Sequence, residues 1–480
     1  MRPQVRLLEP ATIERILAEA FALLMEPGVR VGSSDAIALL QAQGVEVKEG
    51  IAHIPEALAR VALASVPREF WLFNRAGDPM VPYGGDAVHF DPGSSCVQML
   101  DAQSQEVRRA VTADLVRIVQ VAEMLPQYAA QSTAVVCSDL PPEMGDIYRL
   151  SVVLRHSNKP IVTGSFSATG LQGMIDLLIA DAGSADALRE KPRAVFDVCP
   201  SPPLNWSEFG AQNLVELARA GVPAEIVSMP LAGGAAPVTL AGSITQHAAE
   251  AIAGITIHQL ACAGAPIVWG GAPAILDMRT GGAPMGAMET AMLNMGCAEV
   301  GKSLGLPTHG YLVASDSKLV DEQCGAESAR SAVLGALTGI NMISGAGMLD
   351  SLATFSVEKL VLDAESIASA QRLVSGVESS YSSFAIDAFA KAGLSGEFLK
   401  LPETRKLFRQ EQHIPSSVID RASRQDGAQK DALSRAADRV EELVAQYRMP
   451  EIGGSVLDKF QEILERESGR RCAKSAAGSR

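Results

Sequence analysis

Aromatic side chains, paired cysteines and long apolar segments are all scarce in this chain of 480 residues. Its seven cysteines are scattered without CxxC or CxxxC spacing, which argues against a disulfide framework, a zinc ribbon or an iron–sulfur site. Such usage is typical of a reducing compartment. The first nine residues lack the apolar region of a signal peptide, and histidine, glycine and proline interrupt the most apolar stretch, residues 254–271. We therefore expect a cytoplasmic protein without a membrane span.

Positive charge is also in short supply, because 41 lysine and arginine residues face 55 aspartate and glutamate residues, a formal net charge of −14. Such a chain gains nothing from approaching a phosphate backbone, so we expect no nucleic-acid partner and favour a cationic substrate or a basic protein surface. No P-loop, GxSxG elbow or strand–GxGxxG–helix unit is present. His247 and Glu250 provide too few ligands for a metal site, and we expect no directly bound metal.

From residue 111 onward, short apolar segments alternate with long helical patterns. Eight such units over about 250 residues match a (β/α)8 barrel, whose active site lies on the loops after the strands. A doubly wound open sheet is the alternative. The expected strands are residues 132–137, 160–164, 194–199, 225–229, 266–270, 308–313, 340–344 and 359–362.

The ends of the chain have a different character. Residues 1–110 are expected to form helices, at 11–25 and 34–43 among others, and a small β-rich insertion at 70–101 that packs on the barrel. Residues 111–365 form the predicted barrel and residues 366–465 a helical extension, which includes an amphipathic helix over 431–447. The tail, 466–480, is expected to be disordered.

Glycine-rich and polar loops follow several expected strands. Gly233 and Gly234 precede a helix, where backbone N–H groups can hold an anion, but a tight turn explains the same pair equally well. His309 lies in or beside the sixth strand, as a catalytic or a structural histidine.

Four segments, taken in order, resemble the trimethylamine methyltransferase superfamily. They are Asp91-Pro92-Gly93-Ser94, Met229-Pro230-Leu231-Ala232-Gly233-Gly234-Ala235-Ala236-Pro237, Asp277-Met278-Arg279-Thr280-Gly281, and Ser315-Asp316-Ser317-Lys318 with Asp321 and Gln323. The resemblance covers residues 5–450. It implies a TIM barrel that transfers a methyl group from an amine to Co(I) of a corrinoid (cobalamin) carried by a separate protein.

Founding members of this superfamily carry pyrrolysine in the segment that here spans residues 321–327, with Cys324 or Gly325 as our estimate of the aligned position. This sequence has no pyrrolysine, so it resembles the branch that includes glycine betaine methyltransferase. A quaternary ammonium already leaves as a neutral tertiary amine, whereas a tertiary amine needs activation first. We therefore expect a quaternary amine, such as glycine betaine, as the substrate.

Aromatic faces and polar groups hold quaternary ammonium ions, and aromatics make up only 5% of this chain. Core packing is as good an explanation as ligand contact for each aromatic candidate, Phe90 among them. The predicted substrate-binding residues are Trp206, Tyr311, His309, Arg279, Phe355, Gly233 and Gly234, with Arg279 alternatively pairing with Asp277. The residues expected to face the corrinoid are Ser201, Asp316, Gln323, Cys324, Gly325 and Gly345. The catalytic residue is left unassigned.

Two other functions fit the sequence. Lys318, just after the sixth strand, could form a Schiff base in a barrel lyase, although Asp316 and Asp321 nearby would stabilise its charged form. A betaine-binding barrel without catalytic activity is the second alternative. A homo-oligomer is compatible with either.

Overall fold

The computed structural model describes residues 2–101, 104–167, 170–423 and 430–478. Its amino-terminal part confirms the two expected helices and adds a third, with short strands between them. Helix α2 begins where the Ser33 hydroxyl accepts a hydrogen bond from the Ala36 N–H. These elements are α1 (Pro10–Met25), β1 (Val29–Val31), α2 (Ser34–Ala42), β2 (Glu46–Lys48), β3 (Ile51–His53) and α3 (Glu56–Ser65).

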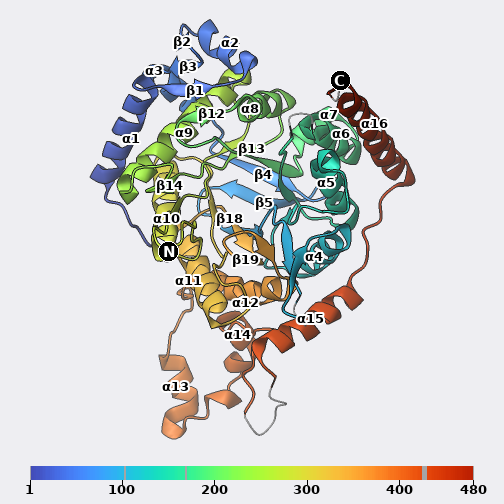
Figure 1. Ribbon diagram of the computed structural model, residues 1–480. Coiled ribbons are helices and arrows are strands. Elements are labelled where there is room, and N and C mark those ends of the chain that lie inside the picture. Colours follow the sequence, from blue (N-terminus) through green and yellow to red (C-terminus); the bar gives the residue numbers. More distant parts are fainter. Residues whose placement is uncertain (1, 102–103, 168–169, 424–429, 479–480) are drawn as a thin grey trace.

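Eight parallel strands form the centre of the molecule, in two sheets (Figure 1). Isolated parallel bridges join Trp269 to Thr308 and Cys96 to Val135, next to the outer strands of both sheets. One sheet has the order β15 (Ile267–Val268), β13 (Ala224–Ile226), β11 (Ala194–Val198), β10 (Ile161–Gly164) and β9 (Gln131–Ser132); the other has the order β17 (His309–Tyr311), β18 (Met342–Ala346) and β6 (His89–Pro92).

Seven of the eight expected strands overlap these elements, but the expected strand at 359–362 is wrong. Those residues lie in α12 (Val357–Val374), which begins where the Ser356 hydroxyl accepts from the Lys359 N–H. Its buried residues Val357, Leu360, Val361 and Ala364 have helical spacing. The eighth parallel strand is β6, inside the segment expected to be an insertion, and it pairs with β18.

A β-hairpin packs against the beginnings of the parallel strands. It consists of β4 (Glu69–Phe73) and β5 (Pro79–Gly84), which Figure 1 shows in the middle of the strands. Side chains of the hairpin and of the strand starts form one buried cluster: Leu72, Val81, Tyr83, Ala130, Val162, Val195, Val268 and Met342. The hairpin therefore fills the amino ends of the strands and leaves the carboxyl ends for a functional site.

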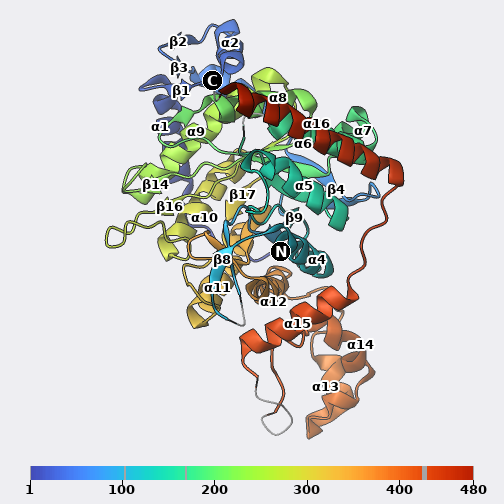
Figure 2. The same cartoon turned by 45° about the vertical axis from the view of Figure 1, so that its right-hand side comes forward.

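Helices surround the strands on the outside (Figures 1 and 2). They are α4 (Thr112–Met124), α5 (Gly145–His156), α6 (Gly170–Ala182), α7 (Ala185–Glu190), α8 (Glu208–Ala220), α9 (Leu240–Ala261), α10 (Met288–Ser303), α11 (Glu322–Thr338) and α12. Short strands and turns decorate the loops: β7 (Gln98–Leu100), β8 (Val107–Arg109), η1 (Pro142–Met144), β12 (Asn205–Trp206), β14 (Leu231–Ala232), β16 (Ala274–Ile275), β19 (Met348–Leu349) and β20 (Thr354–Phe355).

The carboxy-terminal part is helical, as expected. The predicted helix over 431–447 is α15 (Ala432–Gln446), capped by the Asp431 side chain. Before it come α13 (Ile386–Ala392), η2 (Gly393–Ser395), η3 (Phe398–Lys400) and α14 (Pro402–Glu411); after it, α16 (Gly454–Gly478) includes most of the segment expected to be a disordered tail. No helix in the described part of the chain is long and apolar enough to cross a membrane.

Candidate functional site

A cluster of polar side chains, which we call the interior cluster, lies on the parallel strands. Its members come from five different strands: Asp91 (β6), Asp197 (β11), Glu225 (β13), His309 and Tyr311 (β17), and Ser344 (β18). All except Asp197 are less than 9% exposed. Buried polar groups in such number are uncommon in a protein core and point to a functional role.

Hydrogen bonds, together with one close contact between Glu225 and His309 that is not a hydrogen bond, connect most of the cluster into one chain. The Tyr83 hydroxyl, from the hairpin, donates to Glu225 Oε2, and Glu225 Oε1 lies 3.2 Å from His309 Nδ1. His309 Nε2 lies 2.9 Å from the Ser344 hydroxyl, which donates to Asp91 Oδ1 at 2.6 Å. The chain fixes the orientation of every side chain in it.

Burial decides the charges in this cluster. It lowers the pKa of His309 to about 3, so the imidazole is neutral at pH 7. Burial also raises the pKa of Asp91 and of Glu225 well above the usual carboxyl range, and nearby Asp197 raises that of Glu225 further. The pKa of Asp197 rises to about 7, again mainly through burial, while its hydrogen bond with Glu225 lowers it. Glu225 therefore keeps its proton, and Asp197 is the carboxyl group that ionises near neutral pH.

Three carboxyl oxygens of the cluster have no hydrogen-bond partner. Within the described part of the chain these are Asp91 Oδ2, Asp197 Oδ1 and Glu225 Oε1, all of them buried. An unpaired buried acceptor costs about 1–3 kcal/mol, so the arrangement is best explained by a ligand that satisfies it. Because Asp197 as a residue keeps partial exposure, that ligand can enter from solvent.

Tyr311 supplies an aromatic surface beside these carboxyls. Its ring meets the His309 ring edge-on, with centroids 5.9 Å apart, and its hydroxyl accepts from the Ser94 N–H at 2.8 Å. Asp197 and Asp91 are close enough to raise the pKa of Tyr311 electrostatically, in addition to burial. An aromatic ring next to Asp197, the carboxyl group that ionises near neutral pH, is a suitable environment for an organic cation.

Exposed apolar side chains follow six of the parallel strands. Each stands in the loop after a different strand, and parallel strands present their carboxyl ends at one edge, so we expect these side chains on one face. This apolar rim consists of Val97, Val136, Phe166, Met229, Met278 and Leu319, which are 36–73% exposed. Such a surface is suited to a bulky apolar partner.

Of the predicted substrate-binding residues, the structure brings His309 and Tyr311 into the interior cluster. Sequence reasoning missed Asp91, Asp197, Glu225 and Ser344 as site residues. A signal was present for two of them, because Asp197 and Glu225 are acidic residues inside short apolar strands, where a charge is seldom placed without a role.

The other aromatic candidates lie in packed regions outside the cluster. The Trp206 indole is fully buried, donates to the Glu250 carbonyl and lies against Gly254. Phe355 is also fully buried, with its ring against Gly347, and Phe90 belongs to the main hydrophobic core. Their burial favours core packing, the alternative for each of these rings, and their contact with a ligand stays a prediction.

The predicted anion-binding groups are engaged in local structure. The N–H groups of Gly233 and Gly234 donate to Ala236 and Leu231 within a tight turn, so they are not available to a carboxylate. Arg279 is exposed and pairs with Asp277 at 2.9 Å, as the alternative interpretation of that residue held. These contacts favour the alternatives for both sites, a tight turn and the Arg279–Asp277 pair, and their role in substrate binding stays a prediction.

The residues predicted to face the corrinoid are scattered over the loops and helix ends. Ser201 is exposed, and Asp316 accepts from the N–H groups of Met285 and Gly286, which holds two loops together. Gln323 donates to Glu327 at 3.0 Å. Their proximity to a corrinoid stays a prediction.

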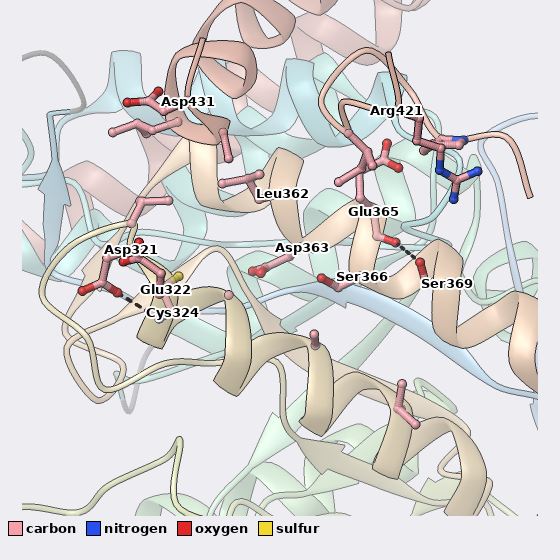
Figure 3. Close-up of a pocket in the computed structure, with 18 of the residues that line it drawn as sticks. Asp321, Glu322, Cys324, Leu362, Asp363, Glu365, Ser366, Ser369, Arg421 and Asp431 are labelled. Carbon is pink, nitrogen blue, oxygen red and sulfur yellow. Dashed lines mark hydrogen bonds between the residues drawn. The ribbon is translucent and has the colours of Figure 1, made fainter. Parts of the chain in front are cut away.

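Cys324 and Gly325 line a separate cavity of about 630 Å³ between α11, α12 and the segment that precedes α15. Figure 3 shows Asp321, Glu322 and Cys324 at one end of this cavity and Glu365 and Arg421 at the other. Burial raises the pKa of the Cys324 thiol to about 12. Cys324 is therefore a neutral thiol outside the interior cluster.

The two glycines predicted to face the corrinoid give opposite expectations on substitution. A Cβ at Gly345 would lie 2.1 Å from the Leu312 carbonyl oxygen, at a φ of +118°, so Gly345→Ala should destabilise the protein by about 2–5 kcal/mol. A Cβ at Gly325, inside α11, meets nothing within 4 Å, so Gly325→Ala should stabilise it by about 0.5–1 kcal/mol. Urea unfolding of both variants measures the difference, and equal stabilities would contradict this account of Gly345.

Comparisons with known proteins agree with one another. A family model described as trimethylamine methyltransferase (MTTB) matches residues 1–470. Trimethylamine methyltransferase from Methanosarcina acetivorans is 30% identical over 456 residues, covering 92% of this chain and 91% of the relative. Glycine betaine methyltransferase from Desulfitobacterium hafniense is 25% identical over 467 residues, covering 96% and 97%. The crystal structure of Methanosarcina barkeri monomethylamine methyltransferase shares the fold, with a TM-score of 0.52, 11% identity and coverage of 97% and 88%.

Proposed function

Because this chain belongs to the trimethylamine methyltransferase (MTTB) family, we propose that it transfers a methyl group from a quaternary amine to a corrinoid carried by a partner protein, in the cytoplasm. The observation that carries the proposal is the buried Asp197 carboxyl group beside Tyr311, which ionises near neutral pH and whose Oδ1 has no hydrogen-bond partner. An ionised carboxyl group in this position favours a cation as the ligand.

Several properties favour a quaternary over a tertiary amine. The sequence contains no pyrrolysine, and one relative at 25% identity is a glycine betaine methyltransferase. A quaternary ammonium has no N–H to donate, so only charge attraction and aromatic contact can hold it. Asp197 and Tyr311 provide these two interactions.

We assign the eight parallel strands to one closed (β/α)8 barrel. The strand order within the two sheets and the bridges Trp269–Thr308 and Cys96–Val135 between them support this assignment. The hairpin β4–β5 then closes the amino end, and the reaction takes place at the carboxyl end, as in other barrel enzymes.

The corrinoid, brought by its carrier protein, supplies the cobalt nucleophile that accepts the methyl group. Its broad apolar ring fits the apolar rim, of which Phe166 and Met278 are the most exposed members at 54% and 73%. This chain contributes by holding the ammonium with a methyl group toward the carboxyl ends and by excluding water from the interior cluster.

The Schiff-base alternative has less support. Lys318 is 68% exposed, pairs with Asp350 at 3.0 Å and donates to the Asp316 carbonyl, whereas a nucleophilic lysine needs desolvation. A binding barrel without catalysis is distinguished by the experiment below.

The test is to mix the purified protein anaerobically with Co(I) cobalamin and, separately, glycine betaine, other quaternary amines or trimethylamine. Loss of the Co(I) absorbance with one quaternary amine, and not with trimethylamine, is expected. If the cognate corrinoid protein is also supplied and no donor reacts, methyl transfer is wrong; tight binding of a quaternary amine in that case would indicate the binding barrel.

A further inference from the structure

Residues 377–412, between α12 and α15, extend away from the body of the molecule (Figures 1 and 2). We call this segment the C-terminal arm. It contains α13, η2, η3 and α14, and none of the residues in these four elements is buried. A folded segment of this length without one buried residue lacks a core of its own.

The arm nevertheless carries large apolar side chains. Six of them are at least half exposed: Val377 (89%), Phe384 (78%), Ile386 (81%), Phe389 (51%), Leu394 (99%) and Leu399 (80%). One aromatic pair, Phe389 and Phe398 with centroids 5.0 Å apart, packs within the arm. Clustered exposure of this kind marks an interaction surface, because monomeric proteins seldom leave it in water.

We propose that the C-terminal arm is covered by a second copy of this chain. An isologous contact places the same surface on both sides, so the surface has to be complementary to itself. A surface with charge of one sign would repel its copy, and the chain as a whole has a net charge of −14.

The charges of the C-terminal arm are compatible with a surface that pairs with its own copy. It has five acidic residues and five basic ones, so it has no net charge within an acidic protein: Glu378, Asp387, Glu397, Glu403 and Glu411 against Lys391, Lys400, Arg405, Lys406 and Arg409. Pairing arm to arm therefore brings together two segments that do not repel each other through net charge.

The exposed apolar area of the arm is also large enough for a stable interface. Six large side chains that each expose on the order of 100 Å² give roughly 600 Å² of apolar surface per arm. Two arms then contribute about 1,200 Å², which is within the range of stable interfaces. The apolar rim at the strand ends is a different surface, and the corrinoid carrier of the proposed function does not need the arm.

Sedimentation velocity of the full chain, from about 1 to 50 μM, tests the proposal. We expect a mass of at least twice the 50.4 kDa of one chain. The double variant Leu394→Asn/Leu399→Asn should raise the dissociation constant at least about 100-fold and shift the mass toward that of one chain. Both side chains are at least 80% exposed, so the fold itself does not depend on them.

Val61→Asn is the matched control, since Val61 is 69% exposed on α3, outside the arm, and its replacement should leave the mass unchanged. Amide exchange of residues 377–412 should slow as the protein concentration rises. A single-chain mass at 50 μM, or a double variant that associates like the original protein, would overturn the proposal. Sedimentation of the full chain with lipid vesicles, lost in the double variant, would overturn the proposal and assign the surface to a membrane.

Discussion

Asp197→Asn is expected to raise the KM for the quaternary amine about 10- to 100-fold, with a smaller change in kcat. The variant keeps the size of the side chain but removes the carboxyl group that ionises near pH 7 and has an unpartnered oxygen. A loss of about 1.4–2.8 kcal/mol in binding corresponds to this factor. Steady-state kinetics with the corrinoid acceptor held constant measure it.

The same carboxyl group predicts a pH dependence. Burial raises its pKa from the ordinary value of 3.8 to about 7, so the group is protonated and uncharged below pH 7 and ionised above it. Attraction for a cation is therefore present above pH 7 and is lost as the pH falls through 7. Below that point KM should rise about tenfold per pH unit, and Asp197→Asn should remove the dependence.

Asp277→Asn is the control for both measurements, because Asp277 is a carboxylate on a loop after the strands that only pairs with Arg279. It should leave KM and its pH profile unchanged. An unaltered KM in Asp197→Asn would show that Asp197 does not hold the ammonium.

Lys359→Met is expected to destabilise the folded protein by about 3–5 kcal/mol. The Lys359 ammonium is fully buried and lies 2.5 Å from Asp363 Oδ2, with further hydrogen bonds of 2.9 Å to the Val313 carbonyl and the Ser328 hydroxyl. Without the lysine, Asp363 keeps its hydrogen bond from the Gly347 N–H but is left as a buried carboxyl group without a counter-ion, and burial already raises its pKa. The urea midpoint of unfolding measures the loss.

Two further variants test whether burial of the Lys359–Asp363 ion pair is the reason for this loss of stability. Lys359→Met/Asp363→Leu removes both charges and should recover part of the lost stability, because an apolar pair of similar volume replaces the ion pair. Lys318→Met breaks the exposed pair with Asp350 and should cost less than about 1 kcal/mol. If Lys318→Met were as destabilising as Lys359→Met, burial would not be the cause.

The alternation of strands and helices was readable from the sequence, whereas one strand was misplaced. Residues 359–362 are apolar enough to resemble a strand, but a short apolar run does not distinguish a buried strand from a buried helix. The strand β6 (His89–Pro92) lies in the segment expected to be a β-rich insertion, so it was not counted among the barrel strands. Its parallel pairing with β18 joins segments about 250 residues apart in the sequence, which no local pattern encodes.

The interior cluster, too, could be predicted from the sequence only in part. His309 was predicted because it lies in or beside the sixth expected strand, and Tyr311 because it is an aromatic residue in that strand. Asp91, Asp197 and Ser344 come from three other strands, and only the folded arrangement brings them together. Trp206 and Phe355 show a further limit, because composition does not tell which aromatic rings pack in the core.

The hairpin β4–β5 closes the interior at the amino ends of the strands, so that it is open at the carboxyl ends alone. With the amino ends of the strands filled, the proposed amine and corrinoid would both have to use the carboxyl ends, one after the other. In an enzyme that works as proposed, the amine enters first and the carrier protein then covers it. The demethylated amine leaves only after the carrier has moved away. The carrier protein would thus close the site as well as accept the methyl group. Water is then excluded from the interior only while the amine and the carrier protein are both bound.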